Sequence, residues 1–256
     1  MCGRFVSARK RLELLEAFAA ERDSVAEDRN PDYNVAPTKR IYSVLQHKPE
    51  EEGRELRLLR WGLVPFWAKD VKGGARMINA RAETVTSKPA FRAAFAKRRC
   101  LIPADGYYEW QTVDKAKQPY YIYRTDGGIL AFAGIYELWR DKSVPEDHES
   151  AWYWSAAIIT TDATDDIGRI HDRTPMVITP ESWSDWLDPA NNDKELLLAT
   201  MLPATSSAAG GLTSHPVSTA VNSVRNNGPA LVEQLAGQGS LAEGSGSGDG
   251  ERPPLF

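Results

Sequence analysis

Short runs of β-branched and aromatic residues recur along the chain, and turn-forming residues separate them. Such runs are typical of strands, which are predicted at residues 41–46, 56–61, 100–102, 107–111, 120–124, 129–137, 152–160 and 176–178. Apolar residues at helical spacing predict helices at residues 8–22 after Ser7, 89–97 after Ser87, and 180–186 with Pro180 first. Many short strands between few helices favour an α+β fold with an antiparallel sheet curled into a barrel-like core.

The end of the chain has a different composition. Residues 236–256 are rich in glycine and serine and contain almost nothing apolar to bury, which predicts a flexible tail. Upstream, the turn-rich breaks are too short to be domain linkers, so residues 1–235 are predicted to form one domain. We find no apolar run of the roughly 20 residues that a membrane helix needs, and no signal peptide. A cytoplasmic protein without a membrane partner is therefore expected.

Composition narrows the possible functions. The 256 residues are 42% apolar and 26% charged, which is ordinary for a globular protein. Two cysteines and four histidines, widely scattered, are too few for a disulfide framework or a zinc cluster, so neither a metal nor a cofactor is expected. The net charge is −4, yet residues 69–99 hold nine basic residues against Asp70 and Glu83, a net charge of +7. This segment fits either a solvated surface or a polyanion site.

Cys2 is the first residue with candidate chemistry. Removal of Met1 would leave a free α-amine beside the thiol, a 1,2-aminothiol. The pKa of an α-amine is about 8 and that of a thiol about 8.5, so both groups can be nucleophilic near neutral pH. An aldehyde can form an imine with the amine, and the thiol can then close a thiazolidine ring. The alternative is an incidental cysteine at a frayed end.

Two side chains are candidates for proton transfer. Glu109 lies among aromatic residues, where desolvation would raise the pKa of its carboxyl toward acid–base use. His171, which titrates near neutral pH, lies just before a predicted apolar strand. For each residue a structural role is the alternative: a solvated carboxylate at a strand edge, and a histidine that only packs.

Aromatic, amide and arginine side chains form further groups. Trp61, Phe66 and Trp67 fall where proline and glycine interrupt the pattern, so they are predicted on a loop, either stacking on bases or covering the core. Asn79 and Arg81, with Glu83, alternate along an extended stretch and are predicted to share one face. A solvated strand with a local ion pair would look the same.

The remaining motifs are weaker. Arg4 follows Gly3 near the start, and arginine suits phosphate recognition. Residues 214–228 are predicted to form turns and caps without chemistry of their own.

Taken together, the motifs resemble one family. Their order and spacing are similar to those of the SRAP family, the fold of the SOS-response-associated peptidases, and the resemblance extends from Cys2 to about Leu235. The motifs that carry it are MCGRF, YNVAPT, WGLVPFW, INARAET, PADGYYEW, IHDRTPM and SHPVSTAVN. The match is weaker over residues 222–227, where family members often order small and amide residues differently.

The resemblance implies a function and a set of site residues. Members bind single-stranded DNA, trap abasic sites covalently and remove their own Met1, so the chain is expected to be an autoproteolytic enzyme with lyase-like chemistry at abasic sites. The residues expected to act on the amine and the sugar are Cys2, Asn79, Glu109 and His171. Those expected to contact DNA are Arg4, Asn34, Pro37, Trp67, Arg81 and Arg173. A monomer is expected.

Two other functions remain open. Type II glutamine amidotransferases also begin with Met-Cys-Gly and use the exposed cysteine as a nucleophile on an amide, without DNA. They continue with an apolar residue, whereas Arg4 stands at that position here. A non-covalent single-stranded-DNA-binding module is the second alternative, and for such a module Cys2 would be dispensable.

Overall fold

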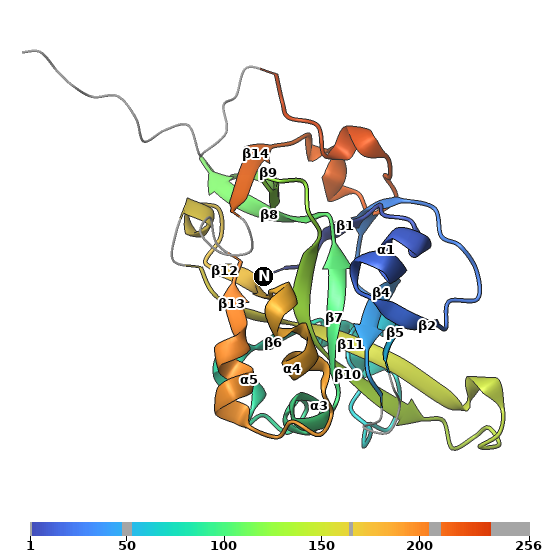
Figure 1. The fold of residues 1–256 in the computed structure, drawn as a ribbon. Coiled ribbons are helices and arrows are strands. Elements are labelled where there is room, and N and C mark those ends of the chain that lie inside the picture. Colours follow the sequence, from blue (N-terminus) through green and yellow to red (C-terminus); the bar gives the residue numbers. More distant parts are fainter. Residues whose placement is uncertain (1, 48–52, 164–165, 205–210, 237–256) are drawn as a thin grey trace, which may run out of the picture.

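Two β-sheets form the body of the protein, with short helices around them (Figure 1). The structure, a computed structural model, describes residues 2–47, 53–163, 166–204 and 211–236. Residues 237–256, nearly all of the predicted tail, lie outside the described residues. The α+β class and the single-domain fold predicted from the sequence are confirmed.

The larger sheet has nine strands within the described residues. They are β2 (Ala20–Asp23), β4 (Arg40–Leu45), β5 (Arg54–Trp61), β6 (Asn79–Arg81), β7 (Arg99–Ala104), β10 (Leu130–Arg140), β11 (Trp152–Asp162), β12 (Arg173–Ile178) and β13 (Met201–Pro203). Five of them, β4, β5, β11, β10 and β7, pair in a closed circuit. The predicted barrel-like core is therefore present, because a sheet that pairs with itself has no open edge along that circuit.

The sheet is mixed, whereas a purely antiparallel sheet was predicted. β11 runs parallel to both β5 and β6, and β2 runs parallel to β5. Parallel neighbours need a long connection, and about ninety residues separate the end of β5 from the start of β11. Local patterning carries no signal for a pairing made over that separation.

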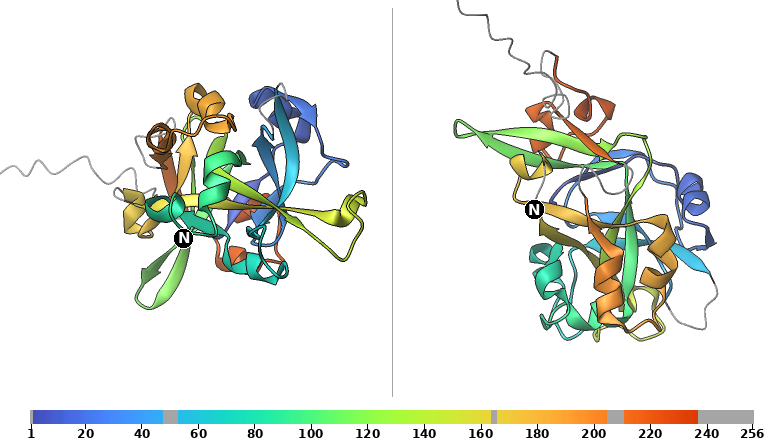
Figure 2. Two further views of the ribbon diagram at one scale, coloured as in Figure 1. Left: turned by 90° about the horizontal axis from the view of Figure 1, so that it is seen from below. Right: turned by 60° about the vertical axis from the view of Figure 1, so that its left-hand side comes forward.

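The smaller sheet has five strands in the order β14-β9-β8-β1-β3. They are β1 (Phe5–Ser7), β3 (Asp32–Val35), β8 (Gly106–Val113), β9 (Ala116–Arg124) and β14 (Leu212–Pro216). β1 is thereby fixed on both sides, by β8 and by β3, and all of its pairings are antiparallel. The β8–β9 and β10–β11 hairpins project from the body of the molecule (Figure 2).

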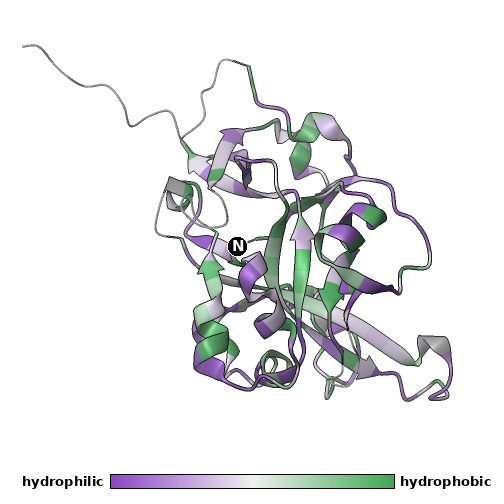
Figure 3. Ribbon diagram, in the orientation of Figure 1, coloured by the Kyte–Doolittle hydropathy of each residue, from purple (hydrophilic) through white to green (hydrophobic). Residues whose placement is uncertain are grey.

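Short helices cover the barrel. They are α1 (Arg11–Ala17), α2 (Ala82–Val85), α3 (Arg92–Lys97), α4 (Trp183–Leu187) and α5 (Lys194–Thr200), with single 3-10 turns between them. α1 and α5 each carry hydrophobic and hydrophilic residues (Figure 3), and Leu14 and Leu197 are their buried positions. Across the described segments, no helix combines the length and the apolar character that a bilayer crossing requires.

Three apolar clusters make up the core. The barrel interior is filled by side chains such as Phe132, Tyr136 and Trp61, and Cys2 belongs to the same cluster. A second cluster lies between the outer face of the barrel and the helices, and the third lies under the smaller sheet. The candidate nucleophile is thus built into the main core.

The predicted helix over residues 8–22 is wrong at both ends. Ser7 belongs to β1, and the helix begins at Arg11. It ends at Ala17 because Ala19 adopts a left-handed conformation, with φ +46°, and its N–H bonds to the Glu16 carbonyl. Residues 20–22 of the predicted helix belong instead to β2, which pairs with β5.

Other element predictions agree with the structure in part. All eight predicted strands are present, and the first helical turn after Pro180 is a 3-10 turn that leads into α4. The short strands β1, β2, β3, β6, β13 and β14 were not predicted as strands. The extended stretch at Asn79 ends at Arg81, and Glu83 lies on α2, so these three side chains do not form one strand face.

Candidate active site

Strand β1 places Cys2 inside the protein. The Tyr108 N–H donates to the Arg4 carbonyl at 2.9 Å, and Phe5 pairs with Tyr107 of β8. The Phe5 ring packs edge-on against Trp61, with centroids 5.2 Å apart. Pairing and packing together hold the residues that precede the strand, and Cys2 is fully buried.

Asn79 holds the backbone of Cys2. Its Nδ2 donates to the Cys2 carbonyl at 2.8 Å. Asn79 begins β6, which is fixed beside β11 by the pairing of Asn79 with Ile158. The Oδ1 atom of Asn79 is buried without a hydrogen-bond partner among the described residues. A buried amide oxygen of this kind can accept a bond from an N–H group placed beside it.

Glu109 is the acidic group of the site. It lies on β8 and is 1% exposed, and burial raises the pKa of its carboxyl to about 7. Burial also raises the pKa of the Cys2 thiol, and the negative charge of Glu109 adds to that increase. At neutral pH the Cys2 side chain is therefore a neutral thiol, and Glu109 is present in both protonation states.

His171 completes the group. It follows a 3-10 turn (Asp166–Arg169), and its Nε2 lies 4.0 Å from Oε2 of Glu109. Its Nδ1 accepts from the Arg173 N–H at 3.0 Å, which fixes the ring toward the carboxylate. Burial lowers the pKa of His171. A neutral imidazole next to a protonatable carboxyl can pass a proton in either direction.

A cleft of about 450 Å³ opens beside these groups. It is lined by Arg4, Glu109, Trp110, Lys117, His171 and Asn222. Trp110 forms one wall, with Nε1 donating to Asn222 Oδ1 at 2.7 Å and the Arg4 guanidinium 5.7 Å from its ring. The lining of the cleft therefore includes two cationic side chains, a carboxyl, an imidazole and an indole.

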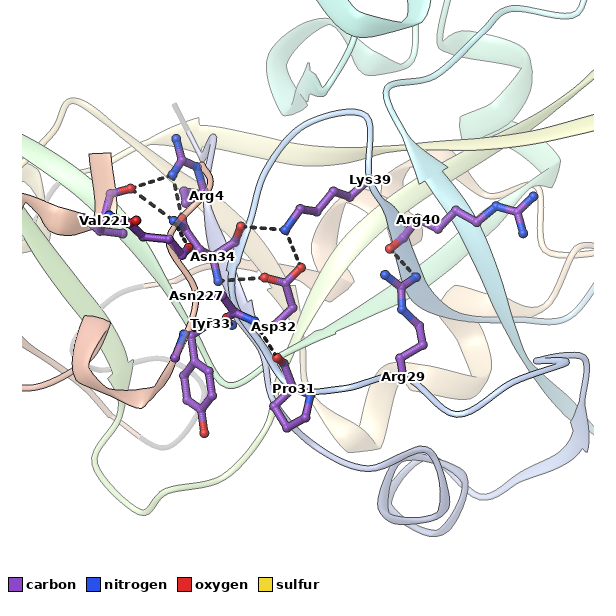
Figure 4. A network of polar contacts seen from close by, with 12 residues as sticks. Arg4, Arg29, Pro31, Asp32, Tyr33, Asn34, Lys39, Arg40, Val221 and Asn227 are labelled. Atoms are coloured by element: carbon purple, nitrogen blue, oxygen red, sulfur yellow. Dashed lines mark hydrogen bonds and ion pairs between the residues drawn. The ribbon is translucent and has the colours of Figure 1, made fainter. Parts of the chain in front are cut away.

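Arg4 and Asn34 tie three distant segments together (Figure 4). Nη1 of Arg4 donates to Asn34 Oδ1 at 2.6 Å and to the Val221 carbonyl at 2.8 Å. Nδ2 of Asn34 donates to the carbonyls of Ser223 and Asn226 at 3.0 and 2.9 Å. Asn34 is fully buried, so it acts on the site through Arg4 and the C-terminal segment.

The predicted role of residues 214–228 is therefore only partly right. They form the strand β14 and short turns, as caps would, but the Val221 carbonyl positions Arg4 and Asn222 lines the cleft. Trp110, Lys117 and Asn222 were not predicted as site residues. Trp110 carried a signal, since it directly follows Glu109, whereas Asn222 reaches the cleft only through the tertiary fold.

Arg173 is buried and already engaged. Its guanidinium forms ion pairs with Glu83, at 3.0 Å, and with Asp162, and it donates to the Thr160 carbonyl at 2.7 Å. The side chain therefore joins α2, β11 and β12 next to His171. Contact of Arg173 with a phosphate stays a prediction.

The other predicted DNA residues lie outside the cleft lining. Arg81 is exposed at the end of β6, and Pro37 is half-buried in the turn between β3 and β4. Trp67 is 58% exposed, on the segment after β5. Trp61, expected on the same loop, is instead fully buried in β5 and donates from Nε1 to the Ile78 carbonyl at 2.9 Å.

Close backbone contact fixes the segment that carries Trp67. Gly62 has φ +127°, and a Cβ atom there would lie 2.6 Å from the Gly74 carbonyl oxygen. A Cβ atom on Gly74 would lie equally close to the Gly62 carbonyl oxygen. Only glycine permits this approach, so the two ends of the segment are held together before the chain enters β6.

The basic segment 69–99 divides into two parts. Arg99 is buried and donates to the carbonyls of Phe95 and Trp186, and Arg98 pairs with Glu137 at 2.9 Å. Both guanidinium groups therefore make contacts that stabilise the fold. The remaining seven basic residues are exposed: Lys69, Lys72, Arg76, Arg81, Lys88, Arg92 and Lys97.

Comparison with known proteins agrees with the motifs gathered around Cys2. Residues 1–224 match the model of the SRAP family, described as SOS response associated peptidase. The chain belongs to the SRAP family. The resemblance inferred from the motifs is therefore confirmed.

Curated relatives within this family carry a common description. The abasic site processing protein YoqW of Bacillus subtilis is 39% identical over 234 residues, which cover 91% of this chain and 99% of that protein. YedK of Escherichia coli, also named an abasic site processing protein, is 32% identical over 92% of this chain and its own full length. The similarly named HMCES of Xenopus tropicalis is 32% identical over 84% of this chain and 69% of its length.

Solved structures share the fold. An X-ray structure of a protein from Bacteroides thetaiotaomicron aligns with a TM-score of 0.76 at 26% identity, covering 91% of this chain and all of the other. A phage-related protein from Bordetella bronchiseptica aligns with a TM-score of 0.62 at 30% identity, covering 84% and 94%. The two-sheet architecture is therefore that of experimentally determined proteins.

Proposed function

We propose that this protein recognises abasic sites in single-stranded DNA and bonds to them covalently through Cys2, after removal of Met1. The observation that carries the proposal is the convergence of three distant segments on Cys2. Asn79 holds its carbonyl, the charge of Glu109 acts on its thiol, and His171 lies 4.0 Å from Glu109. The description of its relatives as abasic site processing proteins supports the same substrate.

The first covalent step joins the amine to the sugar. In its open form the abasic deoxyribose carries an aldehyde at C1′. The α-amine of Cys2 adds to C1′, and proton transfer from nitrogen to oxygen gives a carbinolamine. Loss of the hydroxyl as water then needs a proton on the departing oxygen, and it leaves an iminium ion, the protonated form of an imine. A Glu109 carboxyl with a pKa of about 7 can supply that proton near neutral pH.

The second covalent step closes a ring. The thiol proton passes to a base, the Cys2 sulfur adds to the iminium carbon, and the electron pair of the C=N bond moves to nitrogen. The product is a thiazolidine, with carbon bonded to both sulfur and nitrogen. Because the buried thiol has a raised pKa, it needs a base, and the Glu109 carboxylate left by the first step is near enough for its charge to act on the thiol. Glu109 thus donates one proton and recovers one.

His171 connects this cycle to the solvent. Its lowered pKa keeps it neutral at pH 7, and it lines the open cleft together with Glu109. A neutral imidazole can return the proton to Glu109 from water, or carry it away. We assign His171 to the rate of formation and reversal of the adduct.

Ring closure also limits strand cleavage. An imine at C1′ acidifies the C2′ proton, and loss of that proton expels the 3′ phosphate, which is a lyase reaction. Capture of the imine by the thiol competes with this elimination. A stable crosslink is therefore the expected main product, and strand cleavage should increase when the thiol is absent.

Release of Met1 is the step that exposes the amine. Hydrolysis of the Met1–Cys2 bond adds water across the amide, giving free methionine and the α-amine of Cys2. The charge of Glu109 acts on Cys2, and His171 lies 4.0 Å from Glu109, so the two groups offer the acid and base that amide hydrolysis needs. The peptidase activity and the crosslinking activity would then use the same groups in succession.

Three preparations test the proposal with DNA that carries one abasic site. The processed wild type should give an adduct that survives heat without reductant. Cys2→Ala should keep its affinity for DNA and give only an imine that borohydride traps. An extra residue before Cys2 should abolish both adducts, because the nucleophilic amine is blocked. Mass spectrometry that finds the linkage at a lysine would refute Cys2 as the covalent centre.

The same experiment separates the alternatives. A non-covalent single-stranded-DNA-binding module would bind DNA in all three preparations and give no adduct in any. A glutamine amidotransferase would release ammonia from glutamine without DNA, and loss of Cys2 would abolish that release. The cleft favours DNA, since Arg4 and Lys117 flank Glu109 and offer cations for phosphate.

A further inference from the structure

A second, larger groove lies on the barrel, apart from the Cys2 cleft. It measures about 1010 Å³ and none of its lining residues lines the cleft. Its walls come from the segment after β2, from β4 and β5, and from the start of β11. Basic and aromatic residues share these walls, among them Arg29, Arg40, Arg60, Trp152 and Tyr153.

Two arginines face each other across adjacent strands in this groove. Arg40 of β4 and Arg60 of β5 are register partners in an antiparallel pair, so their side chains project from the same face. Both are exposed, and neither guanidinium has a hydrogen bond or an ion pair within the described part of the chain. Like charges directly opposite each other destabilise a sheet. The fold tolerates this repulsion without compensating for it.

The acidic residues nearby are largely neutralised. Asp32 pairs with Lys39 at 2.6 Å, and Asp28 pairs with Arg11 at 2.8 Å. Of the acids that line the groove, Glu27 remains. The charges of Arg40 and Arg60 are therefore not cancelled by these acids, and the surface of the groove is positive.

Aromatic surface adjoins this charge. Trp152 is 41% exposed, and the phenol of Tyr153 is near enough to Arg40 and Arg60 for both charges to act on its pKa. A cationic groove with exposed rings is the combination that binds single-stranded nucleic acid without sequence preference, since phosphates meet the cations and bases stack on the rings.

The groove and the cleft are joined by one network. Lys39 contacts the Asn34 carbonyl at 3.2 Å, and Asn34 accepts from Arg4 at the cleft. On the other side, Arg29 donates to the Arg40 carbonyl at 2.8 Å within the groove (Figure 4). The turn between β3 and β4 thus links a residue of the cleft, Arg4, to a residue of the groove, Lys39.

We infer that this groove binds single-stranded DNA flanking the abasic nucleotide, with Arg40 and Arg60 on its phosphates and Trp152 stacked on a base. The inference rests on the proposed function and extends the DNA-binding surface beyond the cleft. It implies that affinity grows with the length of the strand, and that the repulsion between the two arginines is relieved when a phosphate lies between them.

The test compares Arg40→Gln/Arg60→Gln with a control of equal charge change, Lys10→Gln/Lys194→Gln, at exposed positions outside the groove. Affinity is measured over a salt series for unmodified strands of about 6 and about 20 nucleotides, lengths that bracket a typical binding site. The affinity of the groove variant should fall about tenfold for the longer strand and stay unchanged for the shorter one. Its log–log salt slope should become shallower by about 1.4, which is about 0.7 for each of two phosphates. Its melting temperature should equal or exceed that of the wild type, because the like-charge pair is gone.

Several outcomes would overturn the inference. One is a salt slope of the groove variant that matches that of the control, and another is an equal loss of affinity for both strand lengths. A third is competition by oligoglutamate as strong as that by DNA, which would mark the groove as a site for acidic peptides. Trp152→Ala gives an independent check, since it should weaken binding of the longer strand without changing the salt slope. Adduct formation on a short abasic strand distinguishes a failure of the groove proposal from a failure of the proposed function. If the groove variant forms the adduct normally, a failed length effect refutes only the groove, whereas no adduct from the wild type refutes the proposed function.

Discussion

The Nε2 atom of His171 lies 4.0 Å from Oε2 of Glu109, and burial raises the pKa of the carboxyl above that of the imidazole, which it lowers. The carboxyl rises to about 7, and the imidazole falls below its ordinary 6.5. Near neutral pH the pair can therefore hold one proton on Glu109 while His171 is neutral. This is the protonation state in which a carboxyl can act as the acid for loss of water.

Glu109→Gln should slow adduct formation by about 10²–10⁴-fold, because the amide can neither donate the proton nor recover it. Affinity for single-stranded DNA should stay near that of the wild type, since a buried carboxyl contributes little to phosphate binding. Single-turnover rates with saturating abasic DNA provide the measurement. If the wild-type rate of adduct formation did not change between pH 5 and pH 8, Glu109 would have no part in the mechanism.

Stability should fall with rising pH because of Glu109. A carboxyl whose pKa is 4.5 when unfolded and about 7 when folded binds its proton more tightly in the folded state. Its contribution is complete below pH 4.5 and is lost as the pH rises toward 7. Relative to wild type, Glu109→Gln should therefore gain stability over this range, on the order of 1 to 3 kcal/mol at pH 8. Denaturant unfolding at pH 5 and pH 8 checks the sign, and an equal difference at both would contradict it.

Asn79→Ala should lower the rate of adduct formation at saturating DNA by about 3- to 10-fold, the equivalent of one ordinary hydrogen bond. The reason is the lost bond from Nδ2 to the Cys2 carbonyl, which orients the amine. Asn79→Asp should be slower still, since a carboxylate would face the carbonyl oxygen. If Asn79→Asp matched the wild type, the 2.8 Å contact would have no role in catalysis.

Arg81→Glu should weaken DNA binding more than Lys10→Glu does. Both side chains are exposed, but only Arg81 lies on the strand that carries Asn79. Loss of one phosphate contact should make the log–log salt slope shallower by about 0.7. Fluorescence anisotropy from low to moderate salt gives the slope, and equal slopes for the two variants would exclude Arg81 from the binding surface.

Trp67→Ala and Trp61→Ala should separate binding from folding. Trp67 is 58% exposed, so its loss should cost about 1–3 kcal/mol of DNA binding, the worth of one stacked base, with little change in stability. Trp61 is fully buried, so its loss should cost about 3–5 kcal/mol of folding free energy. Thermal unfolding and DNA titration of each variant test these two expectations. A Trp61→Ala protein that is stable but binds DNA weakly would show that Trp61, and not only Trp67, contacts DNA.

Local patterning was sufficient for the main strands and insufficient for the short ones. The strands of the barrel are long enough for their apolar character to be visible in the sequence. β2 has the composition of a helix end, AERD, and becomes a strand only because β5 lies beside it. Its conformation is imposed by a partner about thirty residues away, which no local window contains.

The same distinction holds for the site. Cys2, Glu109 and His171 were predictable because each carries a chemical group in an unusual local setting. Asn34 looked like a DNA contact, yet it is fully buried and bonds to backbone carbonyls nearly two hundred residues later in the chain. Trp61 and Trp67 are alike in the sequence, and the pairing of β5 with β4 and β11 separates them.

Strand β1 makes the spacing from Cys2 to Phe5 rigid. Its pairing with β8 and β3 directs Phe5 into the barrel, while the next residue, Val6, packs under the smaller sheet. Inserting or deleting one residue at Gly3 would either move Cys2 away from Asn79 and Glu109 or shift the register and exchange the two faces. Chain ends usually accept length changes freely. Here the residues from Cys2 to Phe5 set a fixed spacing, so a change of length between them should be tolerated less well than a change in an exposed turn.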